Sequence, residues 1–192
     1  ARAGVECVII EDQAWPKRCG HTSGKEIVDR HEAIARIRAA ASAREELGLD
    51  VLIMARTDAV AVAGFDEAMR RVEAFVGAGA DITFLEAPED ERQMAAYCSE
   101  IPGHKTANLV EDGRTPWLEP DALSEMGYSV ALYPVSMLLA ATAAQQARAA
   151  ALRRGRDEPG RVGFDEIRTI VGWPDYERRS AAFAEPDAPD RS

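Results

Sequence analysis

Residues 50–58, "DVLIMARTD", set charged side chains directly against a short apolar run. The run over residues 50–55 has the length and apolar density of a strand that is buried on both faces, as in a parallel sheet. Arg56 and Asp58 follow this run at once. Because a charge beside a buried strand needs a partner or a ligand, the stretch predicts both a sheet and polar groups at its edge.

The same pattern recurs along the chain, which predicts further strands over residues 5–10, 81–85, 105–110 and 128–133. Helical patterns lie between these runs. In residues 65–76 apolar side chains recur at helical spacing, and Gly77 and Gly79 mark the end of the helix. The other helices between strands are expected over residues 34–47, 91–101 and 120–127.

This alternation of strands and helices predicts right-handed βαβ units, and therefore either an open doubly wound sheet or a (β/α) barrel. Five predicted strands cannot close an eight-stranded barrel. For the barrel alternative, we expect the first three strands to precede Ala1. The chain has no initiator methionine and enters a strand almost at once, so we expect it to be the C-terminal part of a longer protein.

The end of the chain differs in composition from the part before it. We expect residues 1–154 to hold five βα units, the last closed by a long Ala-rich helix over residues 137–154. A charged segment with Gly and Pro, residues 155–163, then serves as a linker. Residues 155–192 as a whole are expected to form a helical extension, with helices over 164–171 and 175–183, and a polar tail.

Composition excludes several classes of protein. A formal net charge of -10 makes a nucleic-acid surface unexpected, because phosphate binding requires a concentrated basic face. The chain shows neither an apolar stretch of bilayer length nor a secretory pattern, so we expect no membrane contact and a cytoplasmic location. The three cysteines cannot all pair with one another, which leaves at least one free thiol.

Polar or charged residues directly follow three predicted strands and fall within a fourth: Glu11, Arg56 and Glu86 follow theirs, and Asn108 lies inside the strand at 105–110. In a parallel α/β fold the carboxyl ends of the strands form one rim, where side chains converge on a cleft. Any one of the four residues alone is more simply a solvated loop residue. The set together favours a binding site, because Arg56 and Glu86 adjoin apolar segments.

Residues 17–21, "KRCGH", place a thiol among cations after the first predicted strand. Lys17, Arg18 and His21 are expected to favour the thiolate form of Cys19 and to make it a nucleophile, acid or base near neutral pH. Gly20 permits tight backbone geometry beside the thiol. The alternative, a buried structural thiol, fits these polar surroundings less well.

Several motifs together resemble the isocitrate lyase/phosphoenolpyruvate mutase superfamily. They are "IEDQ" at residues 10–13, "PKRCGH" at 16–21, "ARTDA" at 55–59, "LEAP" at 85–88, Asn108 followed by "VEDGRTP" at 110–116, and "LYPVS" at 132–136. The motifs occur in the family's order and at its spacing, and they cover nearly the whole chain to about Arg154. The methylisocitrate lyase, dimethylmalate lyase and carboxyphosphonoenolpyruvate mutase branch is the most similar.

This resemblance implies a (β/α)8 TIM-type barrel that lacks its N-terminal strands here, with Mg²⁺ or Mn²⁺ and a 2-oxo or 2-hydroxy carboxylate at the C-terminal rim. It implies a homotetramer in which C-terminal helices are exchanged between subunits. Cys19 matches the catalytic acid or base, and Lys17, Gly20 and His21 match the rest of its loop. Glu11 matches a carboxylate of the metal shell, and the substrate-contacting positions match Arg56, Glu86 and Asn108, with Arg56 also catalytic.

Two departures from the family pattern bear on the substrate. Leu139 stands where methylisocitrate-cleaving members carry an arginine, and Val110 stands where tricarboxylate lyases often have Ser or Thr. Both changes remove polar partners for a third carboxylate. The family's upstream serine-glycine loop and metal-binding aspartates are absent from these residues.

We therefore expect a metal-dependent C–C bond lyase that cleaves a small 2-hydroxy dicarboxylate, such as a substituted malate, to a 2-oxo acid and a carboxylic acid. Oxaloacetate hydrolysis or decarboxylation is the nearest alternative, followed by a carboxyphosphonoenolpyruvate phosphonomutase. From a different class, a non-catalytic truncated barrel that serves as a binding module stays open.

Overall fold

The structure is a computed structural model, which describes residues 3–20, 22, 24–156 and 159–183. The chain separates into two compact units, Ala1–Ala141 and Thr142–Ser192. The predicted polar tail lies outside the described residues. The predicted division of the chain into five βα units up to residue 154 and a helical extension after it remains a prediction.

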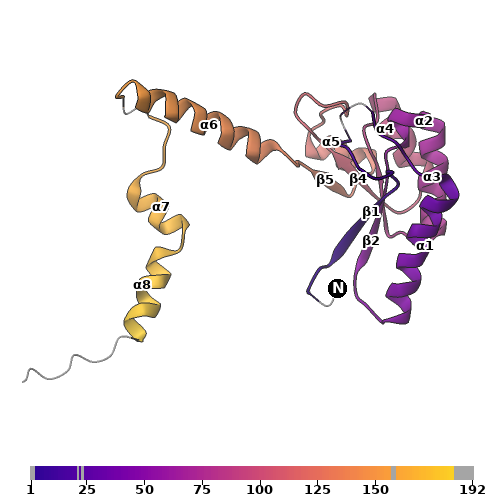
Figure 1. Cartoon of the computed structure of the whole chain (residues 1–192), viewed down its shortest axis with the longest axis horizontal. Coiled ribbons are helices and arrows are strands. Elements are labelled where there is room, and N and C mark those ends of the chain that lie inside the picture. Colours follow the sequence, from indigo (N-terminus) through magenta and orange to yellow (C-terminus); the bar gives the residue numbers. More distant parts are fainter. Residues whose placement is uncertain (1–2, 21, 23, 157–158, 184–192) are drawn as a thin grey trace, which may run out of the picture. The chain divides into compact units, whose positions relative to one another are not determined.

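The first unit is built on a five-stranded parallel sheet (Figure 1). Its strands are β1 (Cys7–Glu11), β2 (Leu52–Thr57), β3 (Ile82–Leu85), β4 (His104–Asn108) and β5 (Val130–Leu132). Each strand pairs with the next strand in the chain, in the order β1-β2-β3-β4-β5. A doubly wound sheet reverses its order at a switch point, so this arrangement is that of successive strands of a (β/α) barrel. The predicted α/β fold is confirmed.

The strands reach one or two residues further than predicted at two of the ends that carry charge. Glu11 and Arg56 do not follow their strands but lie within them, as partners in the register of β1 and β2. The apolar runs alone placed these strand ends too early, because the charged residues still take part in the parallel ladder. Thr57, the last residue of β2, is fully buried and pairs with Leu85.

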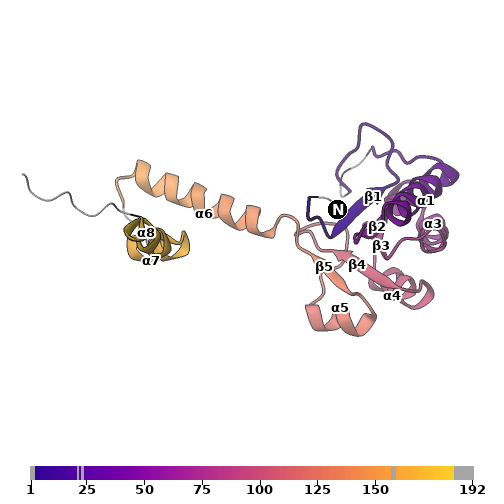
Figure 2. The ribbon, with the colours of Figure 1, turned by 90° about the horizontal axis from the view of Figure 1, so that it is seen from below.

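Helices α1, α3, α4 and α5 cover one face of the sheet (Figure 2). The helices of the chain are α1 (Arg30–Glu46), α2 (Ala59–Ala63), α3 (Phe65–Gly77), α4 (Glu91–Glu100), α5 (Pro120–Met126), α6 (Ser136–Arg153), α7 (Phe164–Ile170) and α8 (Trp173–Ala182). The short helix α2 was not predicted. It begins directly after Asp58, where the Ala59 amide donates to the Thr57 hydroxyl over 3.1 Å.

Local sequence explains where the main helices start and stop. The Asp29 carboxylate accepts from the His31 amide at 2.8 Å and caps α1, and Asp90 caps α4 by accepting from the Gln93 amide at 2.8 Å. Helix α5 starts at Pro120 and ends at Met126, followed by Gly127 as its cap, whose φ of 113° is open to glycine at little cost.

The two faces of the sheet carry different side chains because residues alternate along each strand. Toward the helices, Ile53 and Ala55 pack with Ile37 of α1, while Leu85 and Ala107 join a second apolar cluster. On the other face Met54, Ile82 and Phe84 form a smaller cluster with Cys7 and Leu132. Arg56 follows Met54 on this second face, so the sheet itself aims Arg56 away from the helical layer.

The second unit contains the end of α6 and the helices α7 and α8. Within it, Arg168 and the Trp173 indole both donate to the Glu177 carboxylate at 2.8 Å. Large apolar side chains are nevertheless exposed, among them Phe164 at 77% and Ile170 at 63%. Among the described residues of both units, every helix is too short or too polar to cross a membrane.

Candidate active site

The four residues predicted at strand ends converge at the carboxyl edge of the sheet. The Arg56 Nε atom lies 3.6 Å from Glu11 Oε2, and its Nη1 atom lies 3.5 Å from Glu86 Oε2. The Asn108 amide donates to Glu86 Oε2 at 3.2 Å. Side chains from β1, β2, β4 and the residue after β3 thus meet around one guanidinium.

Arg56 is fixed in place by more than its site partners. Its Nε and Nη2 atoms donate to the two carboxylate oxygens of Asp58, at 2.9 and 3.1 Å. The guanidinium also lies over the Phe84 ring, 4.9 Å from its centroid. Burial by itself raises the pKa of Asp58, but the hydrogen bonds and charge of Arg56, together with Lys25, outweigh it and hold that pKa below its usual range.

Glu86 lies deepest in the site, with 1% of its surface exposed. Burial raises the pKa of the Glu86 carboxyl, and the charge of Arg56 and the amide of Asn108 offset this effect only in part. Gly20 packs directly against this group, because a Cβ atom added there would overlap Glu86 and the Arg56 guanidinium. The Gly20 backbone therefore approaches the site as closely as only glycine allows.

The described residues among 13–27 belong to a loop that is closed at its base. Gln13 and Ile27 make an isolated antiparallel bridge, and the Ala14 amide donates to the Glu26 carbonyl at 2.8 Å. The Gln13 side chain reaches into the loop, where it donates to the Arg18 carbonyl at 2.9 Å and accepts from the Arg18 amide at 2.8 Å. The backbone immediately before Cys19 is thereby fixed.

The backbone immediately after Cys19 is held by Lys25. The Lys25 ammonium donates to the Gly20 carbonyl and forms an ion pair with Asp58 Oδ1 at 3.4 Å. Lys25 is 8% exposed, so its charge is removed from bulk water and depends on these partners. The loop that carries Cys19 is joined in this way to the carboxylate that holds Arg56.

The predicted loop residues occupy different environments. The thiol of Cys19 is free and exposed. The Lys17 ammonium lies 2.9 Å from Glu11 Oε1, so its charge is directed to the rim carboxylate. The predicted catalytic residue His21 lies outside the described residues.

A second layer behind the rim was not predicted as part of the site. Asp12, 1% exposed, accepts from the Thr57 hydroxyl at 2.6 Å and from the Asp58 amide at 2.9 Å. Arg71 of α3 donates to the same carboxylate at 3.0 Å. Burial raises the pKa of Asp12, and the hydrogen bonds from Thr57 and Asp58 and the charge of Arg71 act against that rise. This layer fixes the turn that presents Asp58.

The sequence contained a signal for only some of these unpredicted residues. Asp12 follows Glu11 and Asp58 follows Arg56 by two positions, so both lie in the motifs at the strand ends. Lys25 and Arg71 stand in ordinary polar surroundings, and only the folded chain brings them to the site.

A divalent cation was predicted, with Glu11 as one carboxylate of its shell. Among the described residues, no group of three or more His, Cys, Asp or Glu side chains is arranged to hold a metal ion. The Glu11 carboxylate is engaged by Lys17 and Arg56. These side chains alone do not form a metal site.

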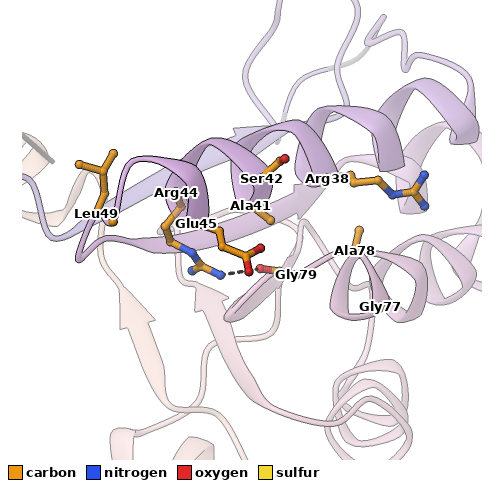
Figure 3. Close-up of a pocket in the computed structure, with 10 residues that line it drawn as sticks. Arg38, Ala41, Ser42, Arg44, Glu45, Leu49, Gly77, Ala78 and Gly79 are labelled. Carbon is orange, nitrogen blue, oxygen red and sulfur yellow. Dashed lines mark hydrogen bonds between the residues drawn. The ribbon is translucent and has the colours of Figure 1, made fainter.

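A hollow of about 680 Å³ lies away from the rim, between the C-terminal ends of α1 and α3 (Figure 3). Arg44 and Arg38 lie at its opposite ends. Arg44 forms an ion pair with Asp81 and donates to the Gly79 carbonyl at 3.4 Å, so its side chain links α1 to the residues that follow α3. Because α1 and α3 end where β2 and β3 are about to begin, this hollow is at the edge of the sheet opposite the candidate site.

Comparisons with known proteins identify relatives of this chain. The family model described as phosphoenolpyruvate phosphomutase matches residues 1–153. The chain is 41% identical to 2,3-dimethylmalate lyase of Eubacterium barkeri over 175 residues, which are 89% of this chain and 60% of that protein. It is 34% identical to 2-methylisocitrate lyase of Bacillus subtilis over 192 residues, 98% of this chain and 62% of that protein.

Solved structures show the same similarity. A structure of 2,3-dimethylmalate lyase, described as a member of the PEP mutase/isocitrate lyase superfamily, matches with a TM-score of 0.83 at 32% identity, over 94% of this chain and 61% of that chain. Oxaloacetate acetylhydrolase in complex with 3,3-difluorooxalacetate matches with a TM-score of 0.88 at 31% identity, over 97% and 64%. The chain thus spans about three fifths of the length of these relatives.

Proposed function

This chain belongs to the PEP mutase/isocitrate lyase superfamily, and we therefore propose that it functions as a C–C bond lyase that acts on a small 2-hydroxy dicarboxylate. The products are a 2-oxo acid and a carboxylic acid. One observation carries the proposal: the Cys19 loop packs through Gly20 against Glu86 and Arg56, which brings the backbone next to the thiol up to the arginine of the proposed anion site.

Each site group has a role that its chemistry suits. The Arg56 fork binds a substrate carboxylate, and its position is preset by Asp58 and Phe84. Cleavage breaks the C–C bond as the 2-hydroxyl gives up its proton to a site carboxylate or to water and becomes a ketone, and it leaves an enolate-like anion on the departing fragment. Cys19 donates a proton to the carbon of that anion, which completes the second product.

The proposed substrate is a dicarboxylate rather than a tricarboxylate. Val110 and Leu139 are apolar at the positions where the family resemblance places partners for a third carboxylate. A buried carboxylate without such partners costs about 1–3 kcal/mol or more. The similarity to 2,3-dimethylmalate lyase supports the same choice. Hydrolysis of oxaloacetate is the second candidate, favoured by the match to oxaloacetate acetylhydrolase.

A divalent cation, Mg²⁺ or Mn²⁺, is part of the proposal. When bound, it supplies charge that stabilises the developing enolate. Glu11 is the described residue that could contribute a carboxylate ligand, directly or through water. The remaining ligands would come from substrate, water or residues outside the described part of the chain.

We also propose that the protein is a homo-oligomer, a tetramer by the family resemblance, in which the C-terminal helices pack on another copy. The support is the apolar surface of α7 and its flanks: Phe164, Ile170 and Val171 are between 63% and 77% exposed. Large exposed apolar side chains gathered on one short segment favour an interaction site.

The test is turnover by the intact protein with Mg²⁺ or Mn²⁺ on three substrates: 2,3-dimethylmalate, 2-methylisocitrate and oxaloacetate. The expected result is release of a 2-oxo acid from dimethylmalate, with a kcat/KM above that for methylisocitrate. Faster cleavage of methylisocitrate would overturn the assignment of substrate size. Failure to turn over any of the three would favour a non-catalytic binding module.

A further inference from the structure

Lys25 holds the one backbone carbonyl that immediately follows Cys19 and, with the same ammonium, the carboxylate that holds Arg56. It donates to the Gly20 carbonyl and lies 3.4 Å from Asp58 Oδ1. Its side chain is 2% exposed and that of Asp58 is fully buried. The two halves of the site, the thiol loop and the strand-end arginine, are thus tied through one buried cation.

The contacts of the loop show why this tie matters. Before Cys19, the Gln13 amide clamps both backbone groups of Arg18 at 2.8 and 2.9 Å. After Cys19, Thr22 donates to the Cys19 carbonyl from within the loop, whereas Lys25 holds the Gly20 carbonyl, and Gly20 in turn packs against Glu86. Without Lys25, the Gly20 carbonyl that follows the thiol would lose its charged hydrogen-bond donor. Asp58 would also lose one of its buried cationic partners.

The free-energy cost of burying the Lys25 charge favours a specific role for this residue over simple packing. A buried lysine loses its hydration and recovers that loss only through well-placed partners. At this position an apolar side chain would fill the same space without that cost, yet it could neither hold the Gly20 carbonyl nor balance Asp58. The charge of Lys25 connects these two groups of the site.

We propose that Lys25 is a positioning residue that fixes the Cys19 loop onto the Asp58–Arg56 pair. This inference rests on the proposed function for its effect on turnover. Its effect on the loop does not depend on any reaction. Lys25 touches the groups that hold the substrate site and is not assigned contact with the substrate.

The first readout is limited trypsin digestion of the intact protein, followed by mass spectrometry of the peptide bonds after Lys17 and Arg18, which lie in the loop. Both residues are exposed, but the contacts of Gln13 and Lys25 restrain the segment around these bonds, so a rise in cleavage rate between variants reports greater release of the loop. In Lys25→Met, the loss of a charged hydrogen bond is expected to raise this rate by about tenfold or more.

The chain offers a matched control in Lys105. It is also buried, at 5% exposure, and its ammonium also donates to a glycine carbonyl, that of Gly103 at 2.7 Å. Lys105 stands near the start of β4, at the edge of the sheet away from the site. Lys105→Met is expected to leave loop cleavage and turnover at the wild-type level even if it lowers the melting temperature as much as Lys25→Met does.

The second readout is the division between kcat and KM. A displaced thiol lowers kcat by roughly 10- to 100-fold while the folded protein still binds substrate, so KM changes less than kcat. Should Lys25→Met not fold, Lys25→Gln keeps an uncharged donor in a similar space and carries the same readouts, with a smaller expected rise in cleavage.

Loop cleavage in Lys25→Met equal to that of the wild type, or equal to that of Lys105→Met, would overturn the proposal. Faster loop cleavage with an unchanged kcat would overturn it as well, since the loop would then not need Lys25 for catalysis. If the wild-type protein turns over none of the substrates, the proposed function fails, and the cleavage comparison alone decides whether Lys25 fixes the loop.

Discussion

Arg56 and Asp58, two residues apart in the chain, form a two-point contact in which both carboxylate oxygens accept from the guanidinium at 2.9 and 3.1 Å. The contact leaves Nη1 directed at Glu86, 3.5 Å away. An arginine held this way is oriented before any ligand arrives.

Arg56→Lys keeps the positive charge but loses the planar fork that both Asp58 and a substrate carboxylate can share. A hydrogen bond to a charged group is worth about 1.5–3 kcal/mol, so KM should rise by roughly 10- to 100-fold. Steady-state kinetics on the best substrate measure this change. Arg70→Lys is the control, because that side chain is 60% exposed on α3, and an equal rise there would contradict the assignment.

Gly20→Ala should disable the site while leaving the fold intact. The added methyl would overlap Glu86 and Arg56, so the loop must move outward and carry Cys19 with it. We expect kcat to fall by about 100-fold, the scale of a displacement of about 1 Å. In Gly77→Ala no heavy atom stands within 4 Å of the new methyl, and its kcat should match the wild type. A Gly20→Ala enzyme with full activity would show that the loop does not work in this position.

Acid should remove the contribution of Asp58 to stability. Its folded-state pKa is lowered by Arg56 and Lys25 against the effect of burial. The charged carboxylate therefore stabilises the fold fully above the unfolded pKa of about 4, and this contribution is lost as the pH falls through the lower folded value. Urea unfolding from pH 7 to pH 3 measures it.

The variant for this test is Asp58→Asn, which breaks a buried pair and should lose about 3 kcal/mol of unfolding free energy at pH 7. The difference from the wild type should shrink as the pH falls below about 4. The exposed Asp50→Asn serves as a control for a general effect of lost charge. A difference between Asp58→Asn and the wild type that stays constant with pH would show that the ion pair is not its source.

Self-association should depend on the apolar surface of α7. Ile170→Asp places a charge on a side chain that is 63% exposed, and light scattering should then report a smaller assembly than the wild type forms. Thr169→Asp, at the neighbouring exposed position, adds the same charge and should leave the mass unchanged. An unchanged mass in Ile170→Asp would contradict the proposed helix packing between copies.

Much of the fold could be predicted because its strands are apolar runs buried by a helical layer. The run at residues 50–55 and the stripe of helix α3 are examples. The helix α2 was missed because "AVAVA" alternates like a strand, and it becomes helical where the Thr57 hydroxyl accepts from the Ala59 amide. The ends of β1 and β2 were placed early because Glu11 and Arg56 remain paired in the sheet, whereas the predicted ends of the fourth and fifth strands lie one or two residues beyond β4 and β5.

The candidate site could be predicted only where chemistry and strand ends coincide in the sequence. Glu86 and Asn108 meet because neighbouring parallel strands end together, a consequence of topology that sequence order already contains. Lys25 could not be found in this way. Its role comes from a loop closure and a contact across the fold to Asp58, and neither leaves a mark in residue type or spacing.

In the proposed reaction, Cys19 supplies the proton at an anion site formed by the strand ends. The most direct measurement compares the kcat of Cys19→Ser with that of the wild type, alongside the affinity of each for oxalate. Cys98→Ser, which alters a half-buried thiol on α4, is the control. We expect kcat to fall by about 10²- to 10⁴-fold in Cys19→Ser with oxalate affinity unchanged, and we expect full activity in Cys98→Ser. A Cys19→Ser protein that turns over substrate as fast as the wild type would contradict it.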